Sequence, residues 1–211
     1  MSNFVERSAR FWDGHAEKYA KQPIKEPEAY EKKLEITRNY LTSESRVLEF
    51  GCGTGSTALL HAPRVQEILA IDSSPKMIEI ANQRKSEAEA KNVTFEQATL
   101  FDLSDEDGSF DVILGMSILH LVEDLDGTLA KVASLLKPGG VFVSSTACVG
   151  HANFFLRWLL PLGGLFWLIP RVQVFDAKTL EAKLQHVGFE IEVSEMINKS
   201  GLTSFLVAKK L

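Results

Sequence analysis

The sequence VLEFGCGTGS occupies residues 47–56 and has the pattern of a strand, a tight turn and the start of a helix. Its first four residues are apolar except for Glu49, as in a buried parallel strand. Three alternating glycines follow, and glycine both tolerates a positive φ and lets a ligand lie directly against the backbone. The free N–H groups at the helix start favour a carboxylate or a phosphate. Because Glu49 would repel a bare pyrophosphate, we expect a ligand that also carries a positive group.

A second strand is predicted at residues 65–71, where the sequence reads VQEILAI, and Asp72 follows it directly. This acid lies about 20 residues beyond the glycine turn, the distance at which nucleotide-binding folds place a carboxylate on a ribose diol. Ser74 and Pro75 then have the pattern of an N-cap and a first helical residue. Ligands of open parallel sheets lie beyond the carboxyl ends of the strands. We therefore expect a nucleoside site at that edge.

Residues 49–55, EFGCGTG, resemble motif I of the class I S-adenosylmethionine-dependent methyltransferases, whose cofactor carries a carboxylate, an ammonium and a sulfonium. The sequence LKPGG at residues 136–140, before a predicted strand at 141–145, resembles a second recurrent feature of this family. The resemblance extends from about residue 47 to the C-terminus. It implies a Rossmann-like, doubly wound α/β fold with a seven-stranded, mostly parallel sheet and a C-terminal antiparallel hairpin.

The predicted organisation is an N-terminal helical flap at residues 1–46 and a cofactor-binding methyltransferase core at residues 47–211. The flap is expected to contain two helices. Asp13-Gly14 is a candidate break within the first helix, and the second is expected from Glu28 to Leu41. An apolar insertion at about 151–175 is expected to form a lid on the core.

The resemblance implies a cofactor site in which the glycine turn binds the methionine carboxylate. Glu49 pairs with the ammonium group, and Asp72 accepts hydrogen bonds from the ribose hydroxyls. The family commonly has an aspartate near the adenine where this chain has Thr99, a neutral partner expected to contribute about 0.5–1.5 instead of about 1.5–3 kcal/mol. Asp102 is the alternative if the register is shifted. The complete implied set is Glu49, Gly51, Cys52, Gly53, Gly55, Asp72, Ser73, Met77, Thr99, Leu100, Gly115 and Met116.

Two side chains are candidates for handling the proton of an acceptor, Tyr19 in the flap and His120 after the fourth predicted strand. The sequence FWD at residues 11–13, followed by Tyr19, resembles the flap of small-molecule methyltransferases, in which the tyrosine lies near the transferred methyl group. His120 lies where an acceptor would arrive, and histidine is a common proton acceptor near neutral pH. A structural role is the alternative for both. Cys52 is interpreted as a small space-filling side chain instead of a nucleophile.

The chain has 211 residues, 45% of them hydrophobic and 24% charged, which is typical of one globular domain. Its net charge of -5, with lysines and arginines interspersed among acids, argues against a nucleic-acid partner, which usually needs a basic stripe. Two cysteines suggest no disulfide framework, and the N-terminus lacks a secretory signal, so a cytoplasmic location is expected. No histidine and carboxylate cluster has metal-ligand spacing, so no metal is expected.

Residues 153–170, NFFLRWLLPLGGLFWLIP, form an unusually apolar stretch. A charge, a proline and a glycine pair interrupt it, and it is too short for a transmembrane helix, which needs about 20 apolar residues. Three interpretations remain open: a lid over an acceptor pocket, a homodimer surface, or a patch that contacts a membrane through Trp158 and Trp167. The lid and the membrane patch both imply an apolar acceptor.

The sequence therefore predicts a methyltransferase that acts on a small, apolar or lipid-like acceptor and yields S-adenosylhomocysteine. A nicotinamide-dependent oxidoreductase is the first alternative, because GTGSTA at residues 53–58 fits the dinucleotide pattern and Asp72 suits its ribose equally well. Glu49, Gly51 and the LKPGG turn favour the methyltransferase. The second alternative is a non-catalytic module that binds the cofactor and docks on a partner through the apolar stretch.

Overall fold

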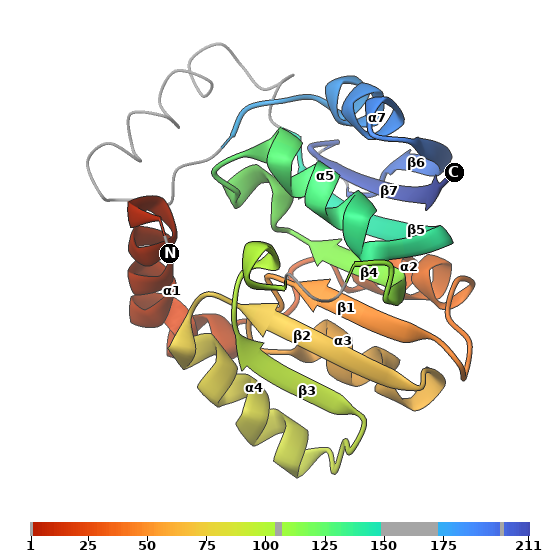
Figure 1. Ribbon diagram of the computed structural model, residues 1–211. Helices are drawn as coiled ribbons and strands as arrows, with labels where there is room; N and C mark the ends of the chain where they lie inside the picture. Colours follow the sequence, from red (N-terminus) through yellow and green to blue (C-terminus); the bar gives the residue numbers. More distant parts are fainter. Residues whose placement is uncertain (1, 104–106, 149–172, 199–200) are drawn as a thin grey trace.

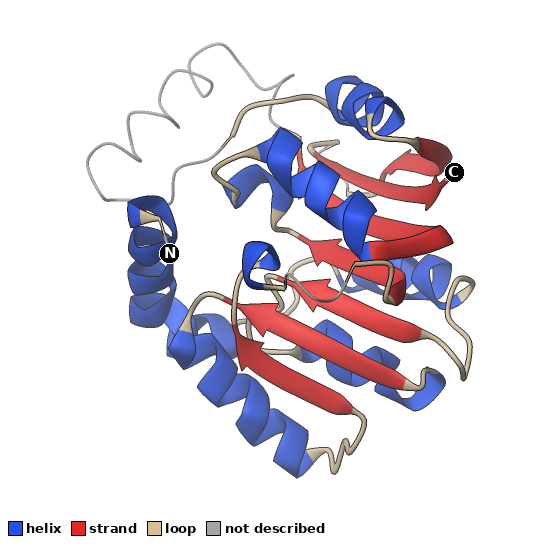
Figure 2. Cartoon of the chain, viewed as in Figure 1, coloured by secondary structure: helices blue, strands red, loops and turns tan. Residues whose placement is uncertain are grey.

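The computed structural model describes residues 2–103, 107–148, 173–198 and 201–211. It shows a seven-stranded sheet, in the order β3-β2-β1-β4-β5-β7-β6, between two layers of helices (Figure 1, Figure 2). The strands β1 to β5 pair in parallel, and β7 pairs antiparallel with both β5 and β6. The strands are β1 Arg46–Phe50, β2 Glu67–Asp72, β3 Val93–Gln97, β4 Phe110–Met116, β5 Leu136–Ala147, β6 Phe189–Met196 and β7 Thr203–Lys210. The predicted fold class is confirmed.

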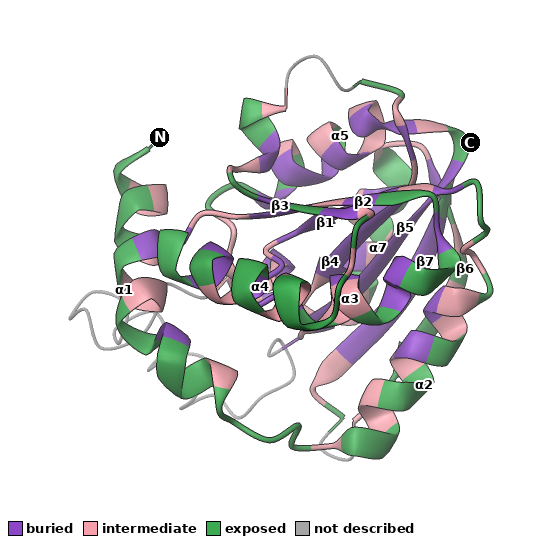
Figure 3. Ribbon diagram, turned by 90° about the horizontal axis from the view of Figure 1, so that it is seen from below, coloured by how far each residue is buried: buried purple, intermediate pink, exposed green. Residues whose placement is uncertain are grey.

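The helices cover the two faces of this sheet. One core cluster joins the sheet to α5 and α7, and a second joins it to α3 and α4, with α2 packed beside them. Figure 3 shows the buried strands between helices whose outer faces are exposed. The helices are α1 Asn3–Ala20, α2 Pro27–Arg38, α3 Ser56–His61, α4 Pro75–Glu87, α5 Leu125–Leu135 and α7 Ala177–His186, with 3₁₀ helices η1 Ala62–Arg64, η2 Leu100–Asp102 and η3 Leu119–Leu121.

Local signals account for several of these boundaries. Ser74 accepts a hydrogen bond from the Met77 backbone N–H at 3.1 Å, and Pro75 occupies the first turn, so α4 begins where the N-cap pattern predicted. In the same way, the side chain of Asp124 caps α5 and that of Asp176 caps α7. Each cap satisfies a backbone N–H group that has no partner inside its helix.

Three details differ from the predicted elements. Helix α1 is continuous through Asp13-Gly14, because a single glycine costs a helix only about 1 kcal/mol and Asp13 instead bonds outside its own helix. Helix α2 ends at Arg38 instead of Leu41. The LKPGG segment belongs to β5, since Leu136 pairs with Phe110 and Val141 with Val112, which leaves residues 137–140 as an irregularity inside the strand.

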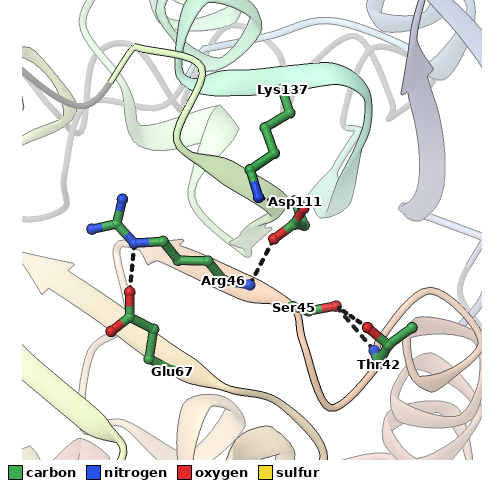
Figure 4. A network of polar contacts seen from close by, with 6 residues as sticks. All are labelled: Thr42, Ser45, Arg46, Glu67, Asp111 and Lys137. Carbon is green, nitrogen blue, oxygen red and sulfur yellow. Dashed lines mark hydrogen bonds and ion pairs between the residues drawn. The ribbon is translucent and has the colours of Figure 1, made fainter.

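The amino edge of the sheet carries a network of paired charges (Figure 4). The Arg46 backbone N–H donates to Asp111 Oδ2 at 2.8 Å, and Lys137 Nζ lies 2.7 Å from Asp111 Oδ1. The side chain of Arg46 donates to Glu67 at 2.5 Å. Although burial raises it, the pKa of Asp111 lies below its usual value because of the hydrogen bonds from Arg46 and Lys137. This edge is therefore electrostatically satisfied.

The opposite, carboxyl edge of the parallel strands faces α1, which stands beyond their arrowheads in Figure 1. The strand order reverses between β1 and β4, which both start from the centre of the sheet and lead to opposite sides. Such a reversal opens a crevice in which α/β proteins bind ligands. Among the helices within the described ranges, none combines the length and apolar character that crossing a membrane requires. The predicted lid at about 151–175 lies outside the described residues except for its last three positions.

Candidate functional site

The glycine turn between β1 and α3 has the conformation that its sequence predicted. Gly51, Gly53 and Gly55 have φ values of +64°, +54° and +78°. A Cβ atom on Gly55 would lie 2.5 Å from the ring of Phe95, so this glycine is required for packing. A Cβ atom on Gly53 would meet only the ring of Tyr19, at 3.9 Å. The backbone at Gly53 is therefore the part of the turn that a ligand can approach.

Asp72, at the end of β2, is joined directly to the glycine turn. Its Oδ2 accepts a hydrogen bond from the Gly53 N–H at 2.9 Å, and its Oδ1 accepts one from the Ser74 N–H at 2.9 Å. Burial raises the pKa of Asp72 and the charge of Asp13 adds to this, while the hydrogen bonds from Ser74 and Gly53 lower it. Since each carboxylate oxygen has two acceptor positions, Asp72 retains capacity for a bound diol.

Glu49 is the most buried acid of the site, with 2% of its surface exposed. Its Oε2 has no hydrogen-bond partner within the described part of the chain. Burial raises the pKa of Glu49 to about 8, the hydrogen bond of the Ala58 backbone lowers it, and the charge of Asp72 raises it further. A buried carboxyl oxygen without a hydrogen-bond partner is costly, and a cationic ligand that donates to it would remove that cost.

A cavity of about 520 Å³ opens beside the turn, at the carboxyl edge of the sheet. This volume lies in the usual range for small-molecule sites. Of the predicted site residues, it is lined by Tyr19, Gly51, Gly53, Asp72, Ser73, Met77, Thr99, Leu100 and Met116. The structure thus gathers these nine residues, which come from five separate parts of the chain, around one space.

The helix α1 closes one side of this cavity with residues that were not predicted as site residues. Phe4, Val5, Ser8 and Trp12 face it, together with Ile118 and Leu121 from the segment after β4. The spacing of the α1 residues is that of one helical face, so the periodicity of residues 3–20 was the signal that could have identified them. Ser2 Oγ donates to Glu123 Oε2 at 2.6 Å, which joins the start of α1 to the far rim.

Five predicted site residues do not line the cavity: Glu49, Cys52, Gly55, Gly115 and His120. Glu49 lies buried in the strand that leads to the turn. Gly115 packs inside the core, where an added Cβ would lie 2.9 Å from Phe50 and 3.3 Å from Phe142. Cys52 is 8% exposed, and burial raises the pKa of its thiol, in keeping with a space-filling role.

His120 lies in η3 and was expected to meet an acceptor. Its Nδ1 is buried and has no hydrogen-bond partner among the residues that the structure describes. Burial lowers the pKa of His120 to about 4, so the ring is neutral at pH 7. The backbone carbonyl of His120 accepts a hydrogen bond from the Gln173 N–H at 2.8 Å. His120 is not among the residues that line the cavity, although Ile118 and Leu121 on either side of it are.

Tyr19 lies over the glycine turn and packs edge-on against Trp12, with ring centroids 5.9 Å apart. Desolvation raises the pKa of its hydroxyl group, and the charges of Asp72 and Glu49 raise it further, while Arg84 lowers it. The hydroxyl group is therefore protonated at neutral pH. Tyr19 can donate a hydrogen bond to a bound molecule.

Thr99, at the position where the family commonly has an aspartate, is hydrogen-bonded to Asp102. Its N–H and its Oγ1 each donate to Asp102 Oδ2 at 2.8 Å, in a capping box at the start of η2. These hydrogen bonds from the Thr99 backbone and side chain hold the pKa of Asp102 below its usual range. Both residues line the cavity, so a carboxylate is present at this rim, three residues later than the resemblance implied.

The residues present fit S-adenosylmethionine by their chemistry. The open backbone at Gly53 can accommodate a methionine carboxylate, and Oε2 of Glu49, which has no partner among the described residues, suits an ammonium group. Asp72 has acceptor positions left for a ribose. The apolar side chains of Met77 and Leu100 line the cavity on the side of η2, where an adenine ring would lie. The carboxylates of Asp72 and Asp102, which line the cavity, also favour a positively charged sulfonium.

Comparisons with known proteins agree with this geometry. Residues 41–166, more than half of the chain, match the family model of a methyltransferase domain. The uncharacterized methyltransferase YcgJ of Bacillus subtilis (strain 168) is 38% identical over 101 residues, which are 48% of this chain and 40% of that protein. A ubiquinone biosynthesis O-methyltransferase of Xanthomonas euvesicatoria is 30% identical over 210 residues, which are 93% of this chain and 83% of that protein.

The chain covers only part of several curated relatives: 40%, 24% and 49% of the length of three of them. A solved structure, the geranyl diphosphate C-methyltransferase from Streptomyces coelicolor A3(2) with Mg²⁺, geranyl diphosphate and S-adenosyl-L-homocysteine, superposes with a TM-score of 0.76. It covers 100% of this chain and 98% of its own, with 12% identity, and so supports the fold. Because the family model matches more than half of this chain and a relative that is 30% identical matches 93% of it, the protein belongs to the class I S-adenosylmethionine-dependent methyltransferases.

Proposed function

We propose that this protein transfers a methyl group from S-adenosylmethionine to a small, apolar acceptor. The observation that carries the proposal is the mixed lining of one cavity. The glycine turn and Asp72 line it together with apolar side chains of α1 and of the segment after β4. A polar nucleoside and an apolar acceptor would each meet a matching surface.

The residues of the cofactor site would bind and orient S-adenosylmethionine. The open backbone at Gly53 would lie against the methionine carboxylate. Glu49 would pair with the ammonium, directly or through water, and Asp72 would accept hydrogen bonds from the ribose. S-adenosylmethionine supplies an electrophilic methyl group on a positively charged sulfur. Transfer of that group is an in-line displacement, so the contribution of the protein is alignment and exclusion of water. Helix α1, which bounds the cavity, is positioned to exclude water.

On the acceptor side, the lining favours an uncharged molecule. Phe4, Trp12 and Leu121 offer apolar surface. The carboxylates of Asp72, Asp102, Glu123 and Asp124 also line the cavity and give it a negative potential, which would repel a phosphate or a carboxylate. The Xanthomonas relative is named for ubiquinone biosynthesis, which supports a lipid-like acceptor.

Tyr19 is the residue that we expect to contact the reacting atom of the acceptor. It lines the cavity beside Gly53, and its protonated hydroxyl group can donate a hydrogen bond that orients an oxygen or nitrogen nucleophile. His120, neutral at pH 7, is the second candidate for accepting a proton, although its ring does not line the cavity in the described structure. A carbon or thiolate nucleophile would need neither.

The proposal is tested by incubating the protein with labelled S-adenosylmethionine and a lipid and metabolite extract, followed by mass spectrometry of the methylated products. We expect one apolar product, and none with Asp72→Ala at low cofactor concentration, because loss of the ribose hydrogen bonds should weaken cofactor binding by about 1–3 kcal/mol. Asp111→Asn, at the opposite edge, is the matched control. Cofactor binding without any methylated product would favour a non-catalytic binding module.

A second measurement separates Tyr19 from His120. Tyr19→Phe should reduce turnover about tenfold while sparing the affinity for S-adenosylhomocysteine, since general acid–base and orienting groups act mainly on the chemical step. His120→Ala should reduce turnover less, because the ring lies outside the lining. Undiminished turnover in both variants would exclude them from the reaction.

A further inference from the structure

Arg84, on α4, joins three parts of the chain without lining the cavity. Its Nη1 donates to Thr54 Oγ1 at 2.6 Å, to Ser56 Oγ at 2.9 Å and to the Thr54 carbonyl at 3.3 Å. Its Nη2 donates to the Ala20 carbonyl at 2.8 Å. Thr54 and Ser56 belong to the glycine turn and the helix start behind it, whereas Ala20 is the last residue of α1. One guanidinium group thus connects the turn to the end of α1.

The chemistry of these contacts requires arginine. The last carbonyl groups of a helix have no partners inside it, and a cation there is favoured by the helix dipole. Thr54 is buried, with 4% of its surface exposed, so its hydroxyl group depends on a partner from within the protein. The planar guanidinium fork presents two nitrogens in a fixed relation, while a lysine presents one. Lysine at this position could satisfy the turn or the helix end, but not both with the same geometry.

The connection bears directly on the site because Tyr19 immediately precedes Ala20. Holding the Ala20 carbonyl fixes the last turn of α1, and that turn places the Tyr19 ring 3.9 Å from the position of a Cβ on Gly53. The charge of Arg84 also acts on the hydroxyl group of Tyr19, whose pKa it lowers against the effect of burial. Farther along α1, Asp13 Oδ1 accepts from the Ser74 hydroxyl group at 2.6 Å, so α4 holds α1 at two points.

We infer that Arg84 is a positioning residue that fastens the end of α1 to the glycine turn and thereby holds Tyr19 over Gly53. Its role in turnover rests on the proposed function, but the connection itself does not. Through it, a ligand that orders the turn also orders the end of α1. Loss of the connection should release the end of α1 while leaving the sheet intact.

The test compares Arg84→Met and Arg84→Lys with Lys85→Met, which removes a charge from the next position of the same helix. In the free protein, Arg84→Met should speed hydrogen exchange of the amides at residues 16–21 by about tenfold, the effect of losing roughly one hydrogen bond. Arg84→Lys should restore part of the protection, and Lys85→Met should leave exchange unchanged. Equal exchange in Arg84→Met and the unaltered protein would overturn the inference.

Binding of S-adenosylhomocysteine, measured by calorimetry, gives the second readout. Arg84→Met should weaken binding about tenfold in the unaltered chain and have no further effect in a Tyr19→Ala background, since residues acting through one contact are not additive. Independent, additive losses would show that Arg84 does not act through Tyr19. Intact coupling without methylation of any acceptor would count against the proposed function alone.

Discussion

The acids at the two edges of the sheet have opposite environments. At the amino edge, Asp111 is paired with Lys137 and with the Arg46 backbone, and its pKa lies below the usual value. At the carboxyl edge, burial raises the pKa of both Glu49 and Asp72, and one oxygen of Glu49 has no partner among the described residues. The paired acid of the first edge contributes to stability. The buried acids of the second edge keep unused hydrogen-bond acceptor positions, which lowers the stability of the fold. Such perturbed groups cluster at functional sites.

The largest expected effect is on stability and distinguishes a packing glycine, Gly55, from a ligand-binding glycine, Gly53, within the same turn. Gly55→Ala should lower the free energy of unfolding by about 2–4 kcal/mol, because φ is positive and the new Cβ would overlap the Phe95 ring. Gly53→Ala should cost only about 1–2 kcal/mol, the penalty of its positive φ, yet abolish measurable binding of S-adenosylhomocysteine. Chemical denaturation and calorimetry check the pair. Equal losses of stability in the two variants would contradict the conclusion that Gly53, unlike Gly55, has open space beside it.

The next effect concerns Glu49 and its pH dependence. In the unfolded chain a glutamate loses its proton near pH 4.3, whereas folded Glu49 keeps it up to about pH 8. Stability is therefore highest below the unfolded pKa and falls as the pH rises through this window. Glu49→Gln should remove this slope and raise the free energy of unfolding by about 1–3 kcal/mol at pH 7.

Denaturation midpoints between pH 5 and pH 9 measure this slope, and parallel curves for the two proteins would contradict the assignment. Calorimetry in buffers of different ionisation enthalpy supplies a second check. At pH 7, binding of S-adenosylhomocysteine should release a proton as its ammonium group pairs with Glu49. The Gln variant should release none.

The smallest expected effect lies at the amino edge. Asp111→Ala should reduce the free energy of unfolding by about 1 kcal/mol, since two hydrogen bonds at a partly exposed carboxylate are lost. The affinity for S-adenosylhomocysteine should not change. A clear loss of affinity would mean that the two edges are coupled through the strands, and the division between stability and binding would then fail.

Much of the fold was predictable because it depends on short-range patterns. The apolar run before the glycines and the cap at Ser74 each act within a few residues, and Asp72 lies at a regular spacing of about 20 residues from the turn. The structure places all three as predicted. The family comparison confirms the class of protein that motif I indicated.

The remainder depends on tertiary placement that no local pattern encodes. The burial of Gly115 follows from the stacking of Phe50 and Phe142, which come from different strands. His120 was expected at the acceptor because of its place after β4, but it lies in a 3₁₀ helix and is not among the residues that line the cavity. The mixed charges of residues 84–87 predicted a solvated helix surface, and this was wrong for Arg84, because its partners lie 28 to 64 residues away in the sequence. The apolar residues 153–170 lie outside the described ranges, and their role stays a prediction.

The position of β7 has a consequence for the way the protein folds. Thr203 pairs with Ala147, and residues 203–210 separate β5 from β6. Pairings between such distant segments form slowly, and until β7 arrives β5 presents a free row of N–H and C=O groups. Intermediates should therefore self-associate at β5. Once folding is complete, β6 forms the border at this end of the sheet, and its exposed Glu190, Glu192 and Glu195 discourage a second chain from adding a strand.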